Sequence, residues 1–252
     1  MKKQMIKSKF RKSSMVFLGA ILGASAIFTS CNEDETPSST IITEEDAYEV
    51  IEGTLIASTY GLTETVEQAS TTVAEEAINS RKAPIECDSL YALSFSASKS
   101  FPNRSYDYNV EGSYKLNCNS NGESSSFEFE NYVTGTYDRT RMSSQDSFES
   151  DLIITGLDPS QTNSIINGSY ERKGTQQSKV RNERSFSSQV TYTLKDLAID
   201  KSLHEIEGGT AQINVLLTAE GKSKTFSANL TFHGDNTASL EIGDNTYTID
   251  LD

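Results

Sequence analysis

Several residue types and patterns are scarce in this chain of 252 residues. Each scarcity narrows the range of folds and functions that the chain can have. There is no tryptophan, and there are only four prolines. Apart from one segment near the N-terminus, no stretch approaches the roughly 18 apolar residues that a membrane-spanning helix needs. Ser, Thr, Asn and Tyr are abundant instead. This balance favours strands with one polar face over a bundle of helices.

The motifs of common catalytic and metal sites are also missing. The chain has no Gly-x-Ser-x-Gly turn, no glycine-rich phosphate loop and no His-Glu-x-x-His sequence. Its two histidines, His204 and His233, lie far apart and do not suggest zinc. Asn117–Gly122 with Glu128 has calcium-loop spacing, but it begins with Asn, and Asn-Gly is typical of hairpin turns. We therefore expect no metal, no cofactor and no enzymatic activity. A hydrolase whose catalytic residues meet only in the fold stays open as an alternative.

Positive charge is in short supply. The chain has 22 Lys and Arg against 36 Asp and Glu, a net charge of −14. Six of the basic residues lie within the first twelve positions. From residue 31 onward, 16 basic residues (22 less 6) therefore oppose all 36 acidic ones, which gives about −20. Such a surface repels nucleic acid and anionic lipid head groups, so we expect no nucleic-acid partner.

The N-terminal segment has three parts. A basic stretch is followed by the apolar run Met15–Phe28, whose length of about 14 residues is too short to cross ~30 Å of hydrocarbon as a helix. The small residues Thr29 and Ser30 then precede Cys31, and an acidic cluster, Asn32–Glu35, follows at once. This order is typical of an export signal that ends at a cysteine.

The segment resembles the lipobox of bacterial lipoproteins, and the acidic residues after Cys31 resemble the surface-export signal of Bacteroidetes-type lipoproteins. The resemblance covers about residues 1–36. It implies a signal peptide at 1–30, acyl chains such as palmitate on Cys31, and a lipidated tether at 31–42. It further implies an outer-membrane lipoprotein that contacts the membrane through its lipid and is displayed on the cell surface, or otherwise on the periplasmic face. A plain secretory signal or an N-terminal membrane anchor is the alternative.

After the tether, we expect a single domain at 43–252 that begins with a helical segment at 43–82. Thr43 suits a helix cap, and the acidic residues after it suit the positive end of the helix dipole. Gly53 and Gly61 are candidate break points, and Pro84 ends the run. Apolar or small residues recur at helical spacing, which indicates one buried face: Tyr48, Ile51, Leu55, Leu62, Val66, Ala69, Val73 and Ala77.

From residue 87 to 252 the apolar period changes to two, which predicts antiparallel strands with one apolar face. We expect about ten strands in sequential order, with a loop at Asp200–Gly209. A Gly-x-Tyr pattern recurs on inward positions and suggests a strongly curved sheet. The predicted fold class is α+β, mainly antiparallel β: an amphipathic helical segment packed on a curved meander sheet or partial barrel. A closed barrel or a two-sheet sandwich with the helix outside is the alternative.

Two of the three cysteines are predicted to pair. With Pro102-Asn103 at the centre of a turn, Phe95 lies opposite Val110 and Tyr91 lies opposite Tyr114. The same register places Cys87 opposite Cys118, and a slip of one residue would misplace both apolar faces. If Cys31 carries lipid outside the cytoplasm, this remaining pair is free to oxidise there. We therefore predict a Cys87–Cys118 disulfide.

Two weaker site candidates remain. Arg139, Arg172 and Arg184 have the inward parity of three strands and are expected near one sheet edge, where they would form the mouth of an anion site. Alternatively, they reach solvent or pair with local acidic residues. Asp88-Ser89-Leu90 resembles the O-glycosylation acceptor of Bacteroidetes-type proteins, which implies glycosylation at Ser89.

The most favoured function is a non-enzymatic binding or interaction module at the cell envelope, with a protein or a small molecule as its ligand. The alternatives are a carrier that holds an anionic or amphiphilic small ligand in the concave sheet, and the hydrolase mentioned above. A sheet filled by the helix would leave a carrier without its cavity. The packing of the inner face therefore distinguishes the first two functions.

Overall fold

The computed structural model describes residues 42–79, 86–180 and 183–252. These residues belong to one compact unit, Ser38–Asp252. The predicted signal peptide at 1–30, Cys31 and all but the last residue of the predicted tether at 31–42 lie outside the described residues.

The helical segment is divided into α1 (Glu44–Leu55), the short 3-10 helix η1 (Ala57–Thr59) and α2 (Leu62–Asn79). Thr43 caps α1, because its hydroxyl accepts from the Asp46 N–H and the Asp46 carboxylate accepts from the Thr43 N–H. The break falls at Gly61, where an added Cβ would lie 2.6 Å from the carbonyl carbon of Leu55. Gly53 lies inside α1. One of the two predicted break points is thus confirmed.

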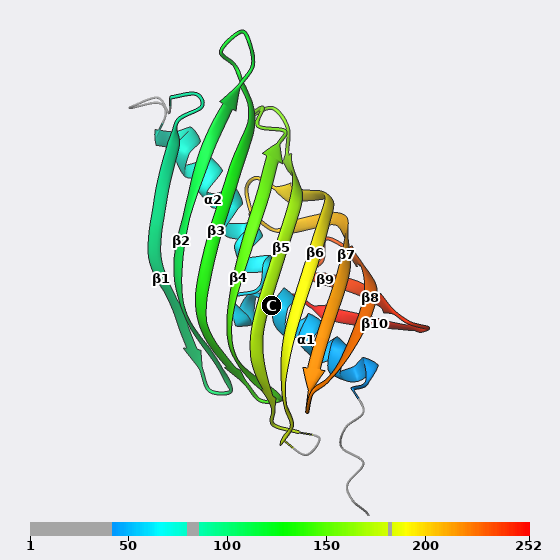
Figure 1. Ribbon diagram of the computed structural model, residues 1–252. Helices are drawn as coiled ribbons and strands as arrows, with labels where there is room; N and C mark the ends of the chain where they lie inside the picture. The colour runs from blue at the N-terminus through cyan, green and yellow to red at the C-terminus, as the bar shows by residue number, and fades with distance from the viewer. Residues whose placement is uncertain (1–41, 80–85, 181–182) are drawn as a thin grey trace, which may run out of the picture. The chain divides into compact units, whose positions relative to one another are not determined.

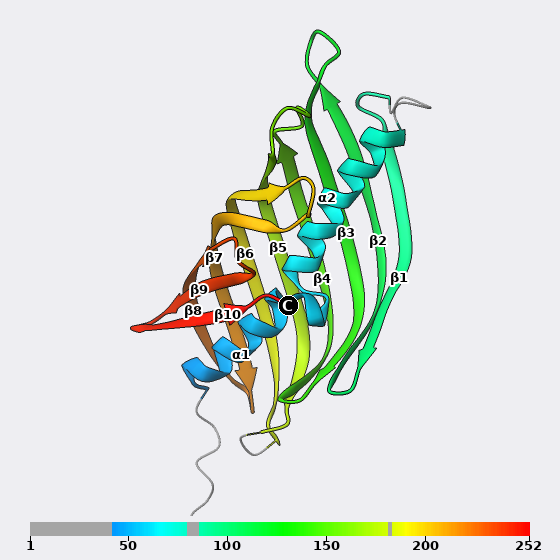
Figure 2. The same ribbon diagram turned by 180° about the vertical axis from the view of Figure 1, so that it is seen from behind.

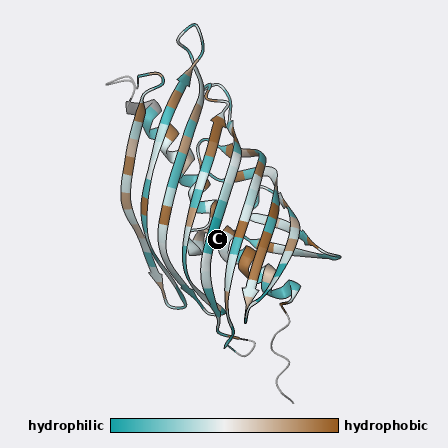
Figure 3. Ribbon diagram, in the orientation of Figure 1, coloured by the Kyte–Doolittle hydropathy of each residue, from teal (hydrophilic) through white to brown (hydrophobic). Residues whose placement is uncertain are grey.

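The strands form one ten-stranded antiparallel sheet in sequential order, so the predicted meander is confirmed. Figure 1 shows β1 to β8 side by side in chain order, and Figure 3 shows hydrophobic and hydrophilic positions alternating along the strands. β1 and β10 do not pair with each other, so the sheet is open and curved, not a closed barrel. The strands are β1 (Leu90–Phe101), β2 (Arg104–Cys118), β3 (Ser124–Arg139), β4 (Met142–Thr155), β5 (Asn163–Ser178), β6 (Ser185–Asp200), β7 (Ile206–Ala219), β8 (Lys222–Phe232), β9 (Thr237–Ile242) and β10 (Asn245–Asp250).

Both helices pack on the same face of the sheet, which Figure 2 shows in front of the strands. α1 contacts β6 and β7, and α2 contacts β4. The apolar faces of the helices and the inward side chains of the strands form one buried cluster; Val50, Ile51, Leu55, Leu62 and Val66 are at most 1% exposed. The inner face is therefore filled by the helices.

The loop predicted at Asp200–Gly209 is shorter than expected. β6 continues to Asp200 and β7 already begins at Ile206. The register between these strands shifts between Lys195 and Ala198, and Asp196 has a positive φ of 51°. A bulge of this kind interrupts the alternation of side chains, so the sequence pattern there resembles a loop.

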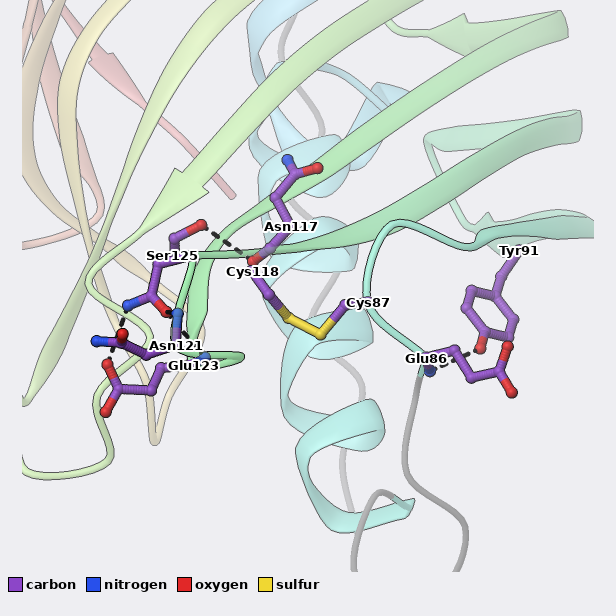
Figure 4. Close-up of a disulfide and its surroundings, with 9 residues drawn as sticks. Glu86, Cys87, Tyr91, Asn117, Cys118, Asn121, Glu123 and Ser125 are labelled. Atoms are coloured by element: carbon purple, nitrogen blue, oxygen red, sulfur yellow. Dashed lines mark hydrogen bonds between the residues drawn. A yellow bond between two sulfur atoms is a disulfide. The ribbon is translucent and has the colours of Figure 1, made fainter.

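The predicted disulfide is present and links the segment before β1 to the last residue of β2 (Figure 4). The Cα atoms of Cys87 and Cys118 are 5.6 Å apart. The register of β1 and β2 is also as predicted, with Phe95 opposite Val110 and Tyr91 opposite Tyr114. The cross-link therefore closes the open end of the outermost hairpin.

Replacing both cysteines, Cys87→Ser with Cys118→Ser, should lower the free energy of unfolding by about 3–4 kcal/mol, because a closed loop of this length restricts the unfolded chain. Urea denaturation of the oxidised wild type and the double variant measures the difference. Reduced wild type is the matched control and should unfold like the variant. Equal stability of the oxidised and reduced protein would contradict the prediction.

Candidate functional site

A buried ion pair lies at the centre of the inner face. Arg172 on β5 and Asp146 on β4 are joined at 3.0 Å, with side chains 1% and 0% exposed. The Arg172 guanidinium also donates to the Tyr108 hydroxyl and to the backbone carbonyls of Thr59 and Tyr60 at 3.2 and 3.3 Å. Arg172 thereby connects three strands to the turn between η1 and α2.

The surroundings of this pair explain how the protein tolerates its charges. Burial disfavours a charged guanidinium, but the Asp146 carboxylate together with the neighbouring tyrosine side chains outweighs that effect and holds the pKa of Arg172 well above its usual value. The Ser144 hydroxyl donates to Asp146 at 2.6 Å. The rings of Tyr108, Tyr137 and Phe148 lie 5.2–5.4 Å from the guanidinium carbon, within the range of cation–π attraction. The pair therefore has a structural role, because it links the strands to the helical segment.

The other two predicted arginines also pair with carboxylates, here on α1. Arg139 contacts Glu52 at 3.0 Å, and Arg184 contacts Asp46 at 2.8 Å. Arg139 and Arg184 therefore both lie at α1, but Arg172 does not. Strand β5 continues six residues beyond Arg172 to Ser178, which is about 20 Å of strand. The expected place of Arg172 near the sheet edge was thus wrong. Anion binding by these arginines stays a prediction.

The remaining predicted residues are placed as follows. Ser89 lies in the turn between Cys87 and β1, next to the disulfide, and is partly exposed. Its glycosylation stays a prediction. Lipidation of Cys31 also stays a prediction, because Cys31 lies outside the described residues.

A wide hollow lies on the outward face of the sheet, opposite the helices. It has a volume of about 620 Å³ and extends across β1 to β6. The strand registers place its outward side chains in two rows. The first contains Ser98, Asp107, Thr136, Gln145 and Thr175. The second contains Ser100, Ser105, Asp138, Ser143, Gln177 and Ser185.

The side chains of these two rows are largely free to bind a ligand. Asp138 accepts a hydrogen bond from Lys179, and the side chains of the other ten bond to none of the residues that the structure describes. Neighbouring outward positions differ, since Ser96 bonds to Asn109 and Gln189 bonds to Glu171. The hollow therefore combines many unused hydroxyl and amide groups with little charge.

The described residues offer little to a catalytic mechanism. Ser70 on α2 and the Nδ1 atom of His204 are 2.9 Å apart, but Ser70 is buried and no carboxylate bonds to the His204 ring within the described ranges. These ranges also contain no cluster of three or more His, Cys, Asp and Glu that would hold a metal ion. None of the described helices is long and apolar enough to span a membrane.

Sequence reasoning missed Asp146 and the hollow. Asp146 has the inward parity of β4, between Met142 and Phe148, and a charge at an inward position is a usable signal for a buried partner. The hollow has no comparable signal, because its Ser, Thr and Gln side chains look like an ordinary solvated face.

Comparison with protein-family models, with curated proteins and with solved structures finds no match to this chain.

Breaking the central pair with Arg172→Met should lower the free energy of unfolding by about 3–5 kcal/mol, because it leaves the Asp146 carboxylate buried without its cation. The double variant Arg172→Met/Asp146→Leu should lose less than the single one. Arg139→Met is the matched control and should lose at most about 1 kcal/mol, since that pair is partly exposed. Urea denaturation measures all three, and equal losses for Arg139→Met and Arg172→Met would contradict the prediction.

Proposed function

We propose that this protein is a non-enzymatic binding module of the bacterial cell envelope, anchored by lipid on Cys31 and binding its ligand on the outward face of its sheet. One observation supports the proposed ligand binding. The helices fill the inner face, whereas the outward face contains the hollow of about 620 Å³ with its unused polar side chains. The helices thus support the sheet from its inner side, and the outward face is exposed for binding.

The anchor part rests on the N-terminal pattern. Each buried CH₂ of an acyl chain contributes about 0.8 kcal/mol, so several chains on Cys31 hold a body at a membrane without a spanning segment. The acidic cluster Asn32–Glu35 supports export to the cell surface. A position on the periplasmic side of the outer membrane is the alternative. Protein partners or small ligands then meet the domain at the envelope.

The chemistry of the hollow indicates its ligand class. Its outward lining consists of Ser, Thr and Gln with two aspartates and has no large apolar side chain. Such a surface binds a ligand rich in hydroxyl groups better than an apolar one, because each buried polar group needs a partner. A neutral polysaccharide meets this requirement. A carrier of an amphiphile needs an inner cavity, and the helices occupy that space.

The anchor is tested by Cys31→Ser in cells fed with radiolabelled palmitate. Wild type should carry label and sediment with the outer membrane, and the variant should do neither. Export of the variant is checked by mass spectrometry of its Cys87–Cys118 pair, which should be oxidised outside the cytoplasm. Label on the variant would contradict the proposal. Protease treatment of intact cells then separates surface display, in which the body is lost, from the periplasmic alternative.

The binding face is tested by native gel electrophoresis in gels that contain dextran, starch or mannan. At least one polymer should retard wild type, and Thr136→Lys, which fills the centre of the hollow, should weaken binding at least about tenfold, the loss of one or two good contacts. Thr231→Lys is the matched control: it adds the same charge to an exposed position on β8 and should bind normally. If none of the three polymers retards wild type, the proposed ligand class is wrong.

A further inference from the structure

A second polar region lies at the end of the sheet where three hairpin turns meet. The β1–β2 turn supplies Pro102 and Asn103, the β3–β4 turn supplies Thr140, and Lys179 follows β5. These residues and the strand ends beside them line a hollow of about 310 Å³. It shares Arg104 and Arg139 with a neighbouring hollow of about 250 Å³ that reaches α1.

Basic side chains cluster at this end of the sheet, although the chain carries a net charge of −14. Arg104 and Arg139 are direct cross-strand partners on β2 and β3, an arrangement in which like charges repel. Arg139 is neutralised by Glu52, and Lys179 is neutralised by Asp138. Among the residues described, no carboxylate pairs with Arg104. One positive charge therefore remains in excess at this point.

The geometry of Arg104 suits it to hold an anion. Its guanidinium carbon lies 4.8 Å from the centre of the Phe101 ring, a cation–π contact that fixes the guanidinium at the turn. None of the described residues accepts a hydrogen bond from the Arg104 side chain, so its N–H groups stay available for two parallel hydrogen bonds to an anion. The Asn103 amide and the Thr140 hydroxyl line the same hollow and bond to no other described side chain. They are two further donors beside Arg104.

We propose that this turn region is a binding site for an oxyanion, with Arg104 as its anchor and Arg139, Asn103 and Thr140 as supporting groups. The occupant is a phosphate, sulfate or carboxylate group, free or carried by a larger ligand. The site adjoins the polar hollow of the outward face, with which it shares Ser105 and Asp138, but its anchor Arg104 does not line that hollow. The proposal does not depend on polysaccharide binding. The site overlaps the predicted anion mouth of Arg139, Arg172 and Arg184 only at Arg139, because Arg172 and Arg184 pair with carboxylates elsewhere.

The experiment measures melting temperature and the ¹H–¹⁵N NMR signals of arginine Nε–H groups in the full-length protein. Phosphate, sulfate and acetate are titrated to 20 mM against sodium chloride of equal ionic strength. For wild type, at least one anion should shift the Arg104 Nε–H signal in a saturable way and raise Tm by about 2–4 °C. A response to phosphate and sulfate alone indicates a tetrahedral group, and a response to acetate indicates a carboxylate.

Arg104→Gln should abolish both responses, and Arg104→Lys should keep only part of them because it lacks the planar fork. In chloride the Tm of Arg104→Gln should be no lower than that of wild type, since Arg139 loses a like-charged neighbour. This result also shows that the variant is folded. Lys222→Gln removes an exposed positive charge at the β7–β8 turn and should respond as wild type does. Equal responses of wild type and Arg104→Gln, or no response of wild type to any of the three anions, would overturn the site.

Discussion

The Arg172–Asp146 pair is the interaction on which the rest of the structure depends. Its groups come from β4 and β5, and through Tyr108 and the carbonyls of Thr59 and Tyr60 it reaches β2 and the turn between the helices. An apolar cluster alone would let two helices slide on a smooth sheet, because the hydrophobic effect has no direction. Hydrogen bonds to a buried charge have strict geometry, so this pair fixes where the helices sit.

The two faces of the sheet consequently have different tasks. The inward face gives most of its apolar surface to the helices, although Phe95 and Phe101 of β1 stay exposed, and most of its buried polar side chains make internal contacts. The outward face keeps its polar side chains for solvent or for a ligand. The inward side also makes ion pairs at the sheet edge, where Glu52 and Asp46 of α1 pair with Arg139 and Arg184. Ion pairs thus fasten the helix along its length, and the domain has a rigid support behind an exposed surface.

The sequence predicted the features that follow from local periodicity. Apolar alternation together with the Pro102-Asn103 turn was enough to find the register of β1 and β2 and, from it, the Cys87–Cys118 bond. The same reasoning placed Arg172 wrongly. After Tyr170 both faces of β5 become polar, with Gln176 and Ser178 inward and Thr175 and Gln177 outward, so the period of two is no longer visible although the strand continues. Asp146 and Arg172 are diagonal neighbours on adjacent strands, a relation that depends on a register the sequence does not show.

The sequential strand order has a consequence for how the chain acquires its structure. Every strand pairs with the next one along the chain, so each pairing closes only a short loop, and the entropy lost at each step is small. The helices come first in the chain, but their contacts with the sheet form last. The contacts of Thr59 and Tyr60 require residues of β2, β4 and β5 that lie up to 113 positions away in the sequence. The chain can therefore build its sheet hairpin by hairpin and then cover it with the helical segment that precedes the strands in the sequence. Docking of the helices would be the slow, cooperative step that completes the fold.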